Sequence, residues 1–327
     1  MLPRQQTAST GRPPPRAPFA RTAWPGEVAT VAYIALVAGI AQAMHLPYVL
    51  FPELGALSHD ILKRPHGTWA RAPVMLVVTP LLTGLVGTLV TRHLNYGIVS
   101  VLLTVGAAIA IIAVLRSPIA PAISAGLLPL TLGIGSPLYA PSLLIGLGAL
   151  AAISTIWRRF VPPPPDAGSP GDLADDITEE APEDYSWIAF VVAFLVIATA
   201  LAEATGRHLL LFPPLVVIAF EMFAHARVCP WAGRPLILPV ACTLTAAAGV
   251  ALVSMFGAVP LAAAASMLVG IGILRAFDLH VPPALAVGLL PFVIPGVDYG
   301  FAIAVGAGTL LLTLFFLGWR RIASVAP

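Results

Sequence analysis

Eight long apolar stretches dominate this chain, and each is close to the roughly 20 residues that cross a lipid bilayer as a helix. Only 10% of the 327 residues are charged, whereas a soluble domain carries roughly 25%. The sequence therefore predicts an all-α, polytopic membrane protein. The stretches cover about residues 28–44, 73–91, 97–115, 141–157, 187–204, 235–254, 258–274 and 299–318.

Four shorter apolar segments, interrupted by Pro and Gly, lie between the long ones at about 47–61, 119–135, 209–223 and 282–296. Cytoplasmic loops are enriched in Lys and Arg, so the basic residues indicate whether these segments cross. If the short segments do not cross the membrane, nine basic residues lie on the cytoplasmic side and eight on the outer side. If all four cross, fifteen lie on the cytoplasmic side and only Arg92 and Arg207 on the outer side. The second pattern predicts twelve crossings, with both termini in the cytoplasm.

An internal repeat relates the two halves of the chain. A shift of 162 residues aligns Trp69 with Trp231, and the run Gly-Leu-Leu-Pro at 126–129 with the same run at 288–291. Each half then holds about six membrane segments, two of them short or broken. Because six is even, the halves run in the same direction across the membrane.

The predicted organisation has five parts. A disordered basic tail (1–22) precedes the first membrane repeat (23–159), and a short tail (323–327) follows the second (186–322). An acidic, Pro-rich linker (160–185) joins the repeats and holds eight of the fifteen acids, which we interpret as solvated. The abundance of Arg, Ala and Pro indicates a GC-rich bacterial genome, so we expect a bacterial inner-membrane protein.

Each short segment contains a proline near its start: Pro52, Pro121, Pro213 and Pro283. Proline is favoured at the first turn of a helix, so these residues are expected to open half-helices. The free N–H groups and the dipole at such N-termini attract anions. Alternatively, the prolines are kinks that help the helices to pack.

Four arginines are candidate anion contacts. Arg116 and Arg275 end equivalent helices directly before the second short segment of each half, which makes them the preferred contacts. Arg71 and Arg234 stand just before the long helices that begin near residues 73 and 235. A role as positively charged membrane anchors is the commoner explanation for Arg71 and Arg234, and it is an equal alternative for Arg116 and Arg275.

A possible proton relay lies at the ends of the first short segments. Asp60 and Glu221 occupy equivalent places there, with His59 and His225 nearby. Histidine titrates near physiological pH, so an acid and a histidine that reach one cavity can pass protons. The alternative is that these residues form solvated turns.

The run His280-Val281-Pro282-Pro283-Ala284, with Phe212-Pro213 and Gly233-Arg234-Pro235 before it, resembles the signature region of the HPP family of integral membrane proteins. The resemblance covers most of residues 187–320 and, more weakly, the first half, as if two HPP-like units stood in tandem. It implies transport of a small anion such as nitrite. That family is described with four spans per unit, against six segments predicted here.

The predicted function is a secondary transporter or channel for a small, nitrite-like anion, held between the halves near the half-helix N-termini. The alternative is a non-transporting membrane scaffold or assembly protein whose acidic linker recruits basic partners. The chain lacks a Walker phosphate loop, a His-Glu-x-x-His pair and a Gly-x-Ser-x-Gly elbow, so no enzyme activity, metal or cofactor is expected. The expected partners are the lipid bilayer and a small anion, but not nucleic acid, and a homo-oligomer is left open.

Overall fold

The computed structural model describes residues 24–162, 176–179 and 186–323, and this part of the chain is helical without strands. Seven helices are long and apolar enough to cross a membrane, which confirms the predicted all-α membrane protein. The predicted tail 1–22 and residues 324–327 lie outside the described residues. The seven helices are α1 (Trp24–Met44), α4 (Pro73–His93), α5 (Ile98–Leu115), α7 (Tyr139–Phe160), α9 (Ile188–Thr205), α11 (Leu238–Phe256) and α14 (Tyr299–Ala323).

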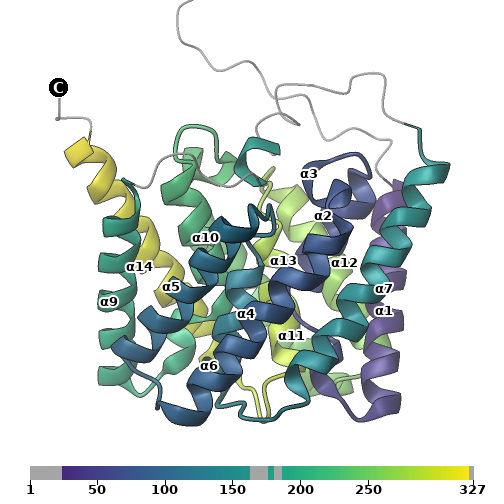
Figure 1. Cartoon of the computed structure of the whole chain (residues 1–327), viewed down its shortest axis with the longest axis horizontal. Helices are drawn as coiled ribbons and strands as arrows, with labels where there is room; N and C mark the ends of the chain where they lie inside the picture. Colours follow the sequence, from purple (N-terminus) through teal and green to yellow (C-terminus); the bar gives the residue numbers. More distant parts are fainter. Residues whose placement is uncertain (1–23, 163–175, 180–185, 324–327) are drawn as a thin grey trace, which may run out of the picture.

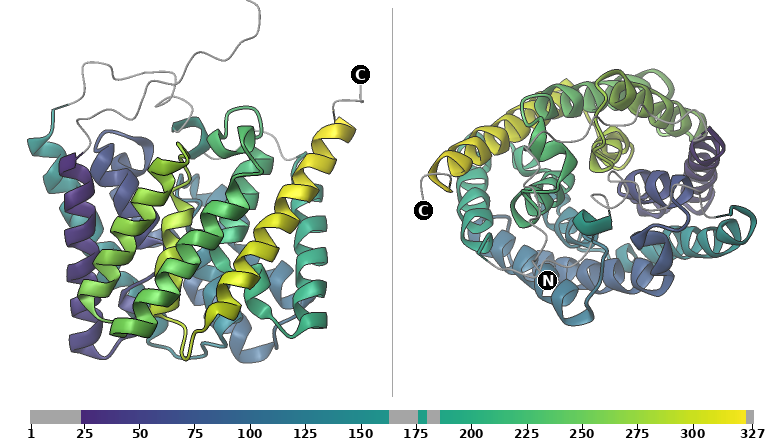
Figure 2. Two further views of the ribbon diagram at one scale, coloured as in Figure 1. Left: turned by 180° about the vertical axis from the view of Figure 1, so that it is seen from behind. Right: turned by 90° about the horizontal axis from the view of Figure 1, so that it is seen from above.

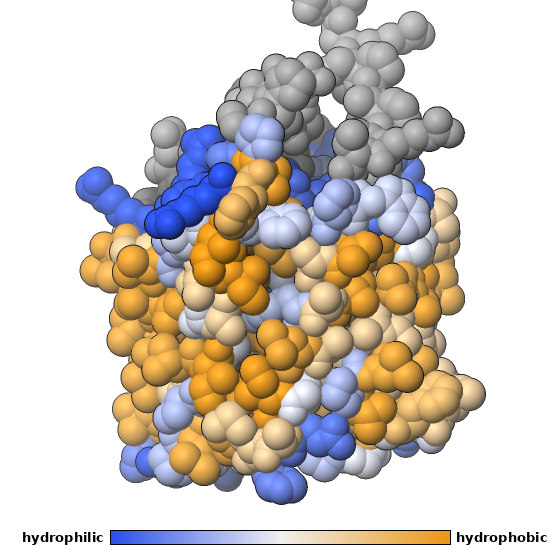
Figure 3. Space-filling view, turned by 90° about the vertical axis from the view of Figure 1, so that its right-hand side faces the viewer, coloured by the Kyte–Doolittle hydropathy of each residue, from blue (hydrophilic) through white to orange (hydrophobic). Residues whose placement is uncertain are grey.

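These seven helices and α12 (Pro260–Ala276) form a ring, in the order α1, α12, α11, α14, α9, α5, α4, α7. Four shorter helices lie inside this ring (Figure 2). Three of them are apolar on nearly every side, and such helices belong in a core. The fourth, residues 54–63, also carries Ser58, His59, Asp60 and Lys63, yet almost all residues of the four helices are buried. Apolar side chains also cover the middle of the outer surface, with polar residues towards both ends (Figure 3). The inner helices are α2 (Leu54–Lys63), α6 (Ala122–Leu132), α10 (Pro213–Ala224) and α13 (Pro283–Leu289).

The first described residue of α1 and the end of α14 lie at the same face of the ring, here called the tail-side face (Figure 1). Successive segments alternate in direction, so each half passes six times between the two faces. Of the seventeen basic residues, four precede residue 24; among the other thirteen, only Arg92 and Arg207 lie at helix ends on the opposite face. The charge separation predicted for crossing short segments is therefore present in the fold.

The repeat extends to individual packing contacts. A Cβ atom placed on Gly87 of α4 would lie 1.9 Å from the carbonyl oxygen of Gly126 in α6, and one on Gly249 of α11 would lie 2.2 Å from that of Gly288 in α13. Each pair is thus a helix crossing that only glycine permits, and the pairs are related by the 162-residue shift. Small residues allow this close approach between membrane helices.

The equivalent helices α6 and α13 nevertheless differ in length, and one hydroxyl group explains why. Proline lacks the N–H that would bond to the carbonyl four residues earlier, so Pro129 leaves the Ala125 carbonyl without its helical partner. The Tyr139 hydroxyl donates to this carbonyl at 2.8 Å, and α6 continues to Leu132. At the equivalent place the chain has Pro291 and Phe301, and α13 ends at Leu289 in the 3-10 turn η5 (Leu290–Phe292).

Candidate functional site

A small pocket opens where the inner helices reach the tail-side face. Two of the residues that line it, Trp69 and Trp231, are related by the repeat, so the pocket lies between equivalent parts of the two halves. Trp69 belongs to the short helix α3 (Thr68–Arg71), and its Nε1–H donates to the Pro118 carbonyl at 2.9 Å. Trp231 belongs to the 3-10 helix η4 (Pro230–Gly233). The other lining residues are Thr178, Glu179, Glu221, His280, Pro282 and Pro283.

Arg64, directly after α2, gathers three carboxylates beside this pocket. Its Nε is 2.8 Å from Asp60 Oδ1 and its Nη1 is 3.1 Å from Asp176 Oδ1, while Nη2 contacts Glu179 Oε1. Only 11% of the Arg64 side chain is exposed. Charge-assisted hydrogen bonds of this kind are stronger than neutral ones, so the cluster ties the end of α2 to residues 176–179.

Asp176 and Glu179 come from the acidic linker, whose residues 176–179 form a helical turn against the membrane domain. Asp176 Oδ1 also accepts a hydrogen bond of 3.2 Å from the Thr68 N–H at the start of α3. The interpretation of the linker acids as solvated is therefore wrong for these two residues. The reason is that a largely buried arginine, separated from them by more than 110 residues in the sequence, attracts them.

A second small pocket shares His280 and Pro282 with the first and is lined further by Glu27, His59 and Arg275. Its basic residue is already paired, since Arg275 Nη2 lies 2.5 Å from Glu27 Oε2. The Arg275 guanidinium also lies over the Trp24 ring, 5.5 Å from its centre. Arg275 therefore joins α12 to the start of α1, in addition to lining the pocket.

The other predicted arginines lie away from the pockets. Arg116 is exposed at the end of α5, which stands across the ring from α12 (Figure 2), so the structure does not bring Arg116 and Arg275 together. Arg71 and Arg234 are also exposed. Arg234 Nη1 lies 3.6 Å from Asp278 Oδ2, an exposed pair of the kind that anchors a loop.

The residues of the predicted proton relay do gather at the tail-side face. His59 lies in α2 within electrostatic range of Lys63, Arg64, Arg275 and His280. Asp60 and Glu221 are both buried and interact electrostatically. His225 follows α10 directly. The solvated turn that we considered as the alternative does not describe His59, Asp60 or Glu221, because all three are buried.

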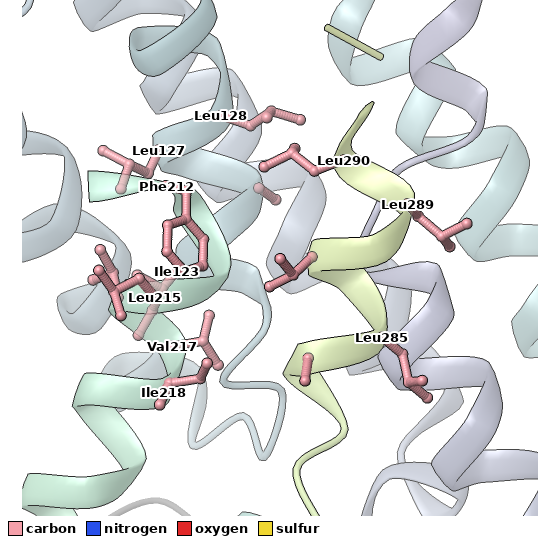
Figure 4. Close-up of a cluster of buried hydrophobic side chains, with 14 of the residues drawn as sticks. Ile123, Leu127, Leu128, Phe212, Leu215, Val217, Ile218, Leu285, Leu289 and Leu290 are labelled. Carbon is pink, nitrogen blue, oxygen red and sulfur yellow. The ribbon is translucent and has the colours of Figure 1, made fainter. Parts of the chain in front are cut away.

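The four predicted prolines are buried near the starts of the inner helices. Pro213 and Pro283 are first helical residues, Pro121 is the N-cap of α6, and Pro52 precedes the N-cap of α2. Only Pro283 lines a pocket among those described. Ile123 of α6 packs with Phe212 and Leu215 at the start of α10 in the apolar core, whereas Leu285 of α13 points away from them (Figure 4).

Glu53 is a candidate that the sequence prediction missed. This N-cap residue of α2 is 2% exposed, and its Oε1 accepts a hydrogen bond from the Ser124 hydroxyl of α6. The signal was in the repeat, because Phe51-Pro52-Glu53-Leu54 aligns with Phe212-Pro213-Pro214-Leu215. An acid at the break of a short membrane segment, where the other half has proline, marks a site for which a function should be sought.

Comparison with protein-family models, with curated proteins and with solved structures gives no match to this chain. What the protein does must therefore be inferred from the chemistry of its own buried polar groups.

Proposed function

We propose that this protein is a membrane transporter for a small anion, and that the anion enters through the tail-side pocket. The observation that carries the proposal is the Arg64 cluster, in which a largely buried guanidinium beside the pocket already holds carboxylates of the linker. A site that holds carboxylates offers the same positive charge and N–H donors to a free anion. Nitrite is the first candidate because of the resemblance to the HPP family.

The surrounding charge favours entry of an anion from this face. Eleven of the thirteen basic residues in the described part of the chain lie at the tail-side face, and Lys63, Arg64, Arg275 and His280 surround His59. A concentration of positive charge raises the local concentration of anions. The positive-inside rule identifies this face with the cytoplasm, which would be that of a bacterial cell.

In this proposal Asp176 and Glu179 occupy the anion site when no substrate is bound, so the linker competes with substrate. Proteoliposomes offered nitrite, nitrate, chloride and small carboxylates test it. If displacing the two linker contacts costs about 1 kcal/mol in total, the variant D176N/E179Q takes up its anion about fivefold faster than the wild type. The variant E203Q, which changes an exposed acid at the end of α9 on the other face, is the control and keeps the wild-type rate.

Two results contradict the proposal. The first is that no anion of the panel enters wild-type proteoliposomes faster than protein-free liposomes. The second is that D176N/E179Q and the wild type take up the same anion at the same rate, which removes the linker and Arg64 from the entry route.

The alternative function, a non-transporting scaffold, is favoured by one observation. The inner helices are almost completely buried, and apolar side chains of α6, α10 and α13 belong to one buried core (Figure 4). Deletion of residues 166–184 separates the two functions. A transporter keeps or increases its anion flux after this deletion. A scaffold that recruits partners through the linker shows no anion flux before the deletion and no longer binds its partner after it.

A further inference from the structure

Glu53 lies inside the ring, about halfway between its two faces. The antiparallel pair α1–α2 shows this, because Gly26 packs against Leu62 and the Thr30 hydroxyl donates to the Ser58 carbonyl at 3.2 Å. In an antiparallel pair of helices the numbers of facing residues have a constant sum, and both contacts give 88. Glu53 therefore faces residue 35 of α1. That residue is close to the centre of α1, which covers Trp24–Met44.

The chain reaches this depth without a helix, through the 3-10 turn η2 (Pro47–Val49) and a buried stretch up to Glu53. Broken backbone inside a membrane must find its hydrogen bonds within the protein. Here the N–H groups of Leu50, Leu54 and Gly55 donate to the carbonyls of Pro47, Phe51 and Pro52. The break therefore places the Glu53 carboxyl group in the interior at a defined position.

The surroundings of Glu53 provide hydroxyl groups but no cation. Ser124 donates to Oε1, while Oε2 is buried without a partner among the described residues. The titratable side chains nearby are Tyr139 of α7, with Tyr48 beyond it, and Tyr33 of α1. The hydroxyls of Tyr139 and Tyr33 donate to the carbonyls of Ala125 and Gly146, and α6 and α13 have no titratable residue.

A bare carboxylate in such a place is very costly, because Glu53 is buried and no cationic side chain of the described residues pairs with it. The Glu53 side chain also makes no capping hydrogen bond to α2, whose first N–H groups, those of Leu54 and Gly55, already donate to carbonyls. A carboxylic acid that accepts one hydrogen bond from Ser124 and keeps its own proton fits this site. When water or substrate reaches the site, the same group can release that proton.

We infer that Glu53 is a proton-binding site, and that it couples proton movement to anion transport. The coupling part rests on the proposed function. An anion bound in the interior disfavours a second negative charge nearby, so it strengthens proton binding by Glu53. Linkage is reciprocal, so a proton on Glu53 strengthens anion binding equally. The two ions then cross together in the same direction.

The first measurement detects the proton itself. The infrared spectrum of the purified protein at pH 7 is expected to show the carbonyl stretch of a buried carboxylic acid. Replacement by E53Q removes this band, whereas E203Q retains it. The amide in E53Q imitates the neutral acid in size and accepts the Ser124 hydrogen bond, so this variant folds. Identical carboxylic-acid bands in wild type and E53Q overturn the proton site.

The second measurement tests the coupling, with nitrite as the probe. One proton per anion predicts about tenfold accumulation in wild-type proteoliposomes for each pH unit of inward proton gradient. E53Q loses this accumulation but still exchanges internal for external nitrite. Equal accumulation by E53Q and the wild type overturns the coupling. If the wild type moves none of the panel anions yet the infrared band is lost in E53Q, the proposed transport function fails and the proton site stands.

Discussion

The two halves of this protein share their helix packing but differ in their buried polar groups. The Gly87–Gly126 crossing has its equivalent in Gly249–Gly288. The second match is Gly146, which approaches Val49 and Leu54 as Gly308 approaches Leu210 and Leu215. These positions differ by 161 or 162 residues. The repeated small residues thus specify one architecture twice.

Several buried polar groups do not follow this repeat. Where the first half has Glu53, Ser124 and Tyr139, the second has Pro214, Ala286 and Phe301. At the tail-side end of the same short helices, Lys63-Arg64 corresponds to Ala224-His225. This difference indicates a division of roles between the halves. Both halves contribute helices to the ring, but only the first contributes the proposed proton site and the guanidinium that holds the linker.

Replacing Arg64 by the residue of the second half, in the variant R64H, should have the largest effect on stability. A neutral imidazole leaves Asp60 and Glu179 buried without their cation, and breaking such a pair costs about 3 kcal/mol. Unfolding in detergent measures the loss. R64H/E179Q recovers part of it, and R116Q, at an exposed arginine, changes stability by less than about 0.5 kcal/mol. If R64H and the wild type are equally stable, the exchange of arginine for histidine between the halves makes no difference to stability.

The glycine crossings should respond alike in the two halves. A methyl group in G87A or G249A meets a backbone carbonyl that has no room to move, and we expect each variant to lose about 2 kcal/mol of unfolding free energy. G106A is the control, since a Cβ there contacts nothing within 4 Å. If one variant loses much unfolding free energy and the other loses none, the two glycine crossings are equivalent in sequence but not in packing. Thermal unfolding of the three variants in one detergent makes the comparison.

The smallest effects should come from exchanging one hydroxyl between the halves. Y139F removes the hydrogen bond to the Ala125 carbonyl that Pro129 leaves unpaired, and should cost about 1 kcal/mol. F301Y offers the same bond to the Val287 carbonyl before Pro291, and should stabilise the second half by a smaller amount. Thermal unfolding measures the expected loss of stability in Y139F and the expected gain in F301Y. If Y139F is as stable as the wild type, another cause must explain the different lengths of α6 and α13.

Much of the fold was predictable because the membrane makes simple demands on a sequence. Long apolar runs became the ring helices, and Pro-containing short runs became the inner helices. The candidate site was less predictable. Arg116 and Arg275 follow equivalent helices, yet those helices lie across the ring from each other (Figure 2). Equivalent positions in a repeat are related by symmetry, and symmetry places two residues close together only near its axis, where Trp69 and Trp231 are found.

The amino-acid sequence alone was sufficient for the membrane class, the repeat and the separation of basic residues, because hydropathy and charge act locally along the chain. Contacts between distant segments required the folded molecule. Arg64 meets Asp176 and Glu179, more than 110 residues away, and Glu53 meets Ser124, 71 residues away. Scarce charges in a membrane protein are buried where packing brings partners together, so their placement is a property of the packed structure.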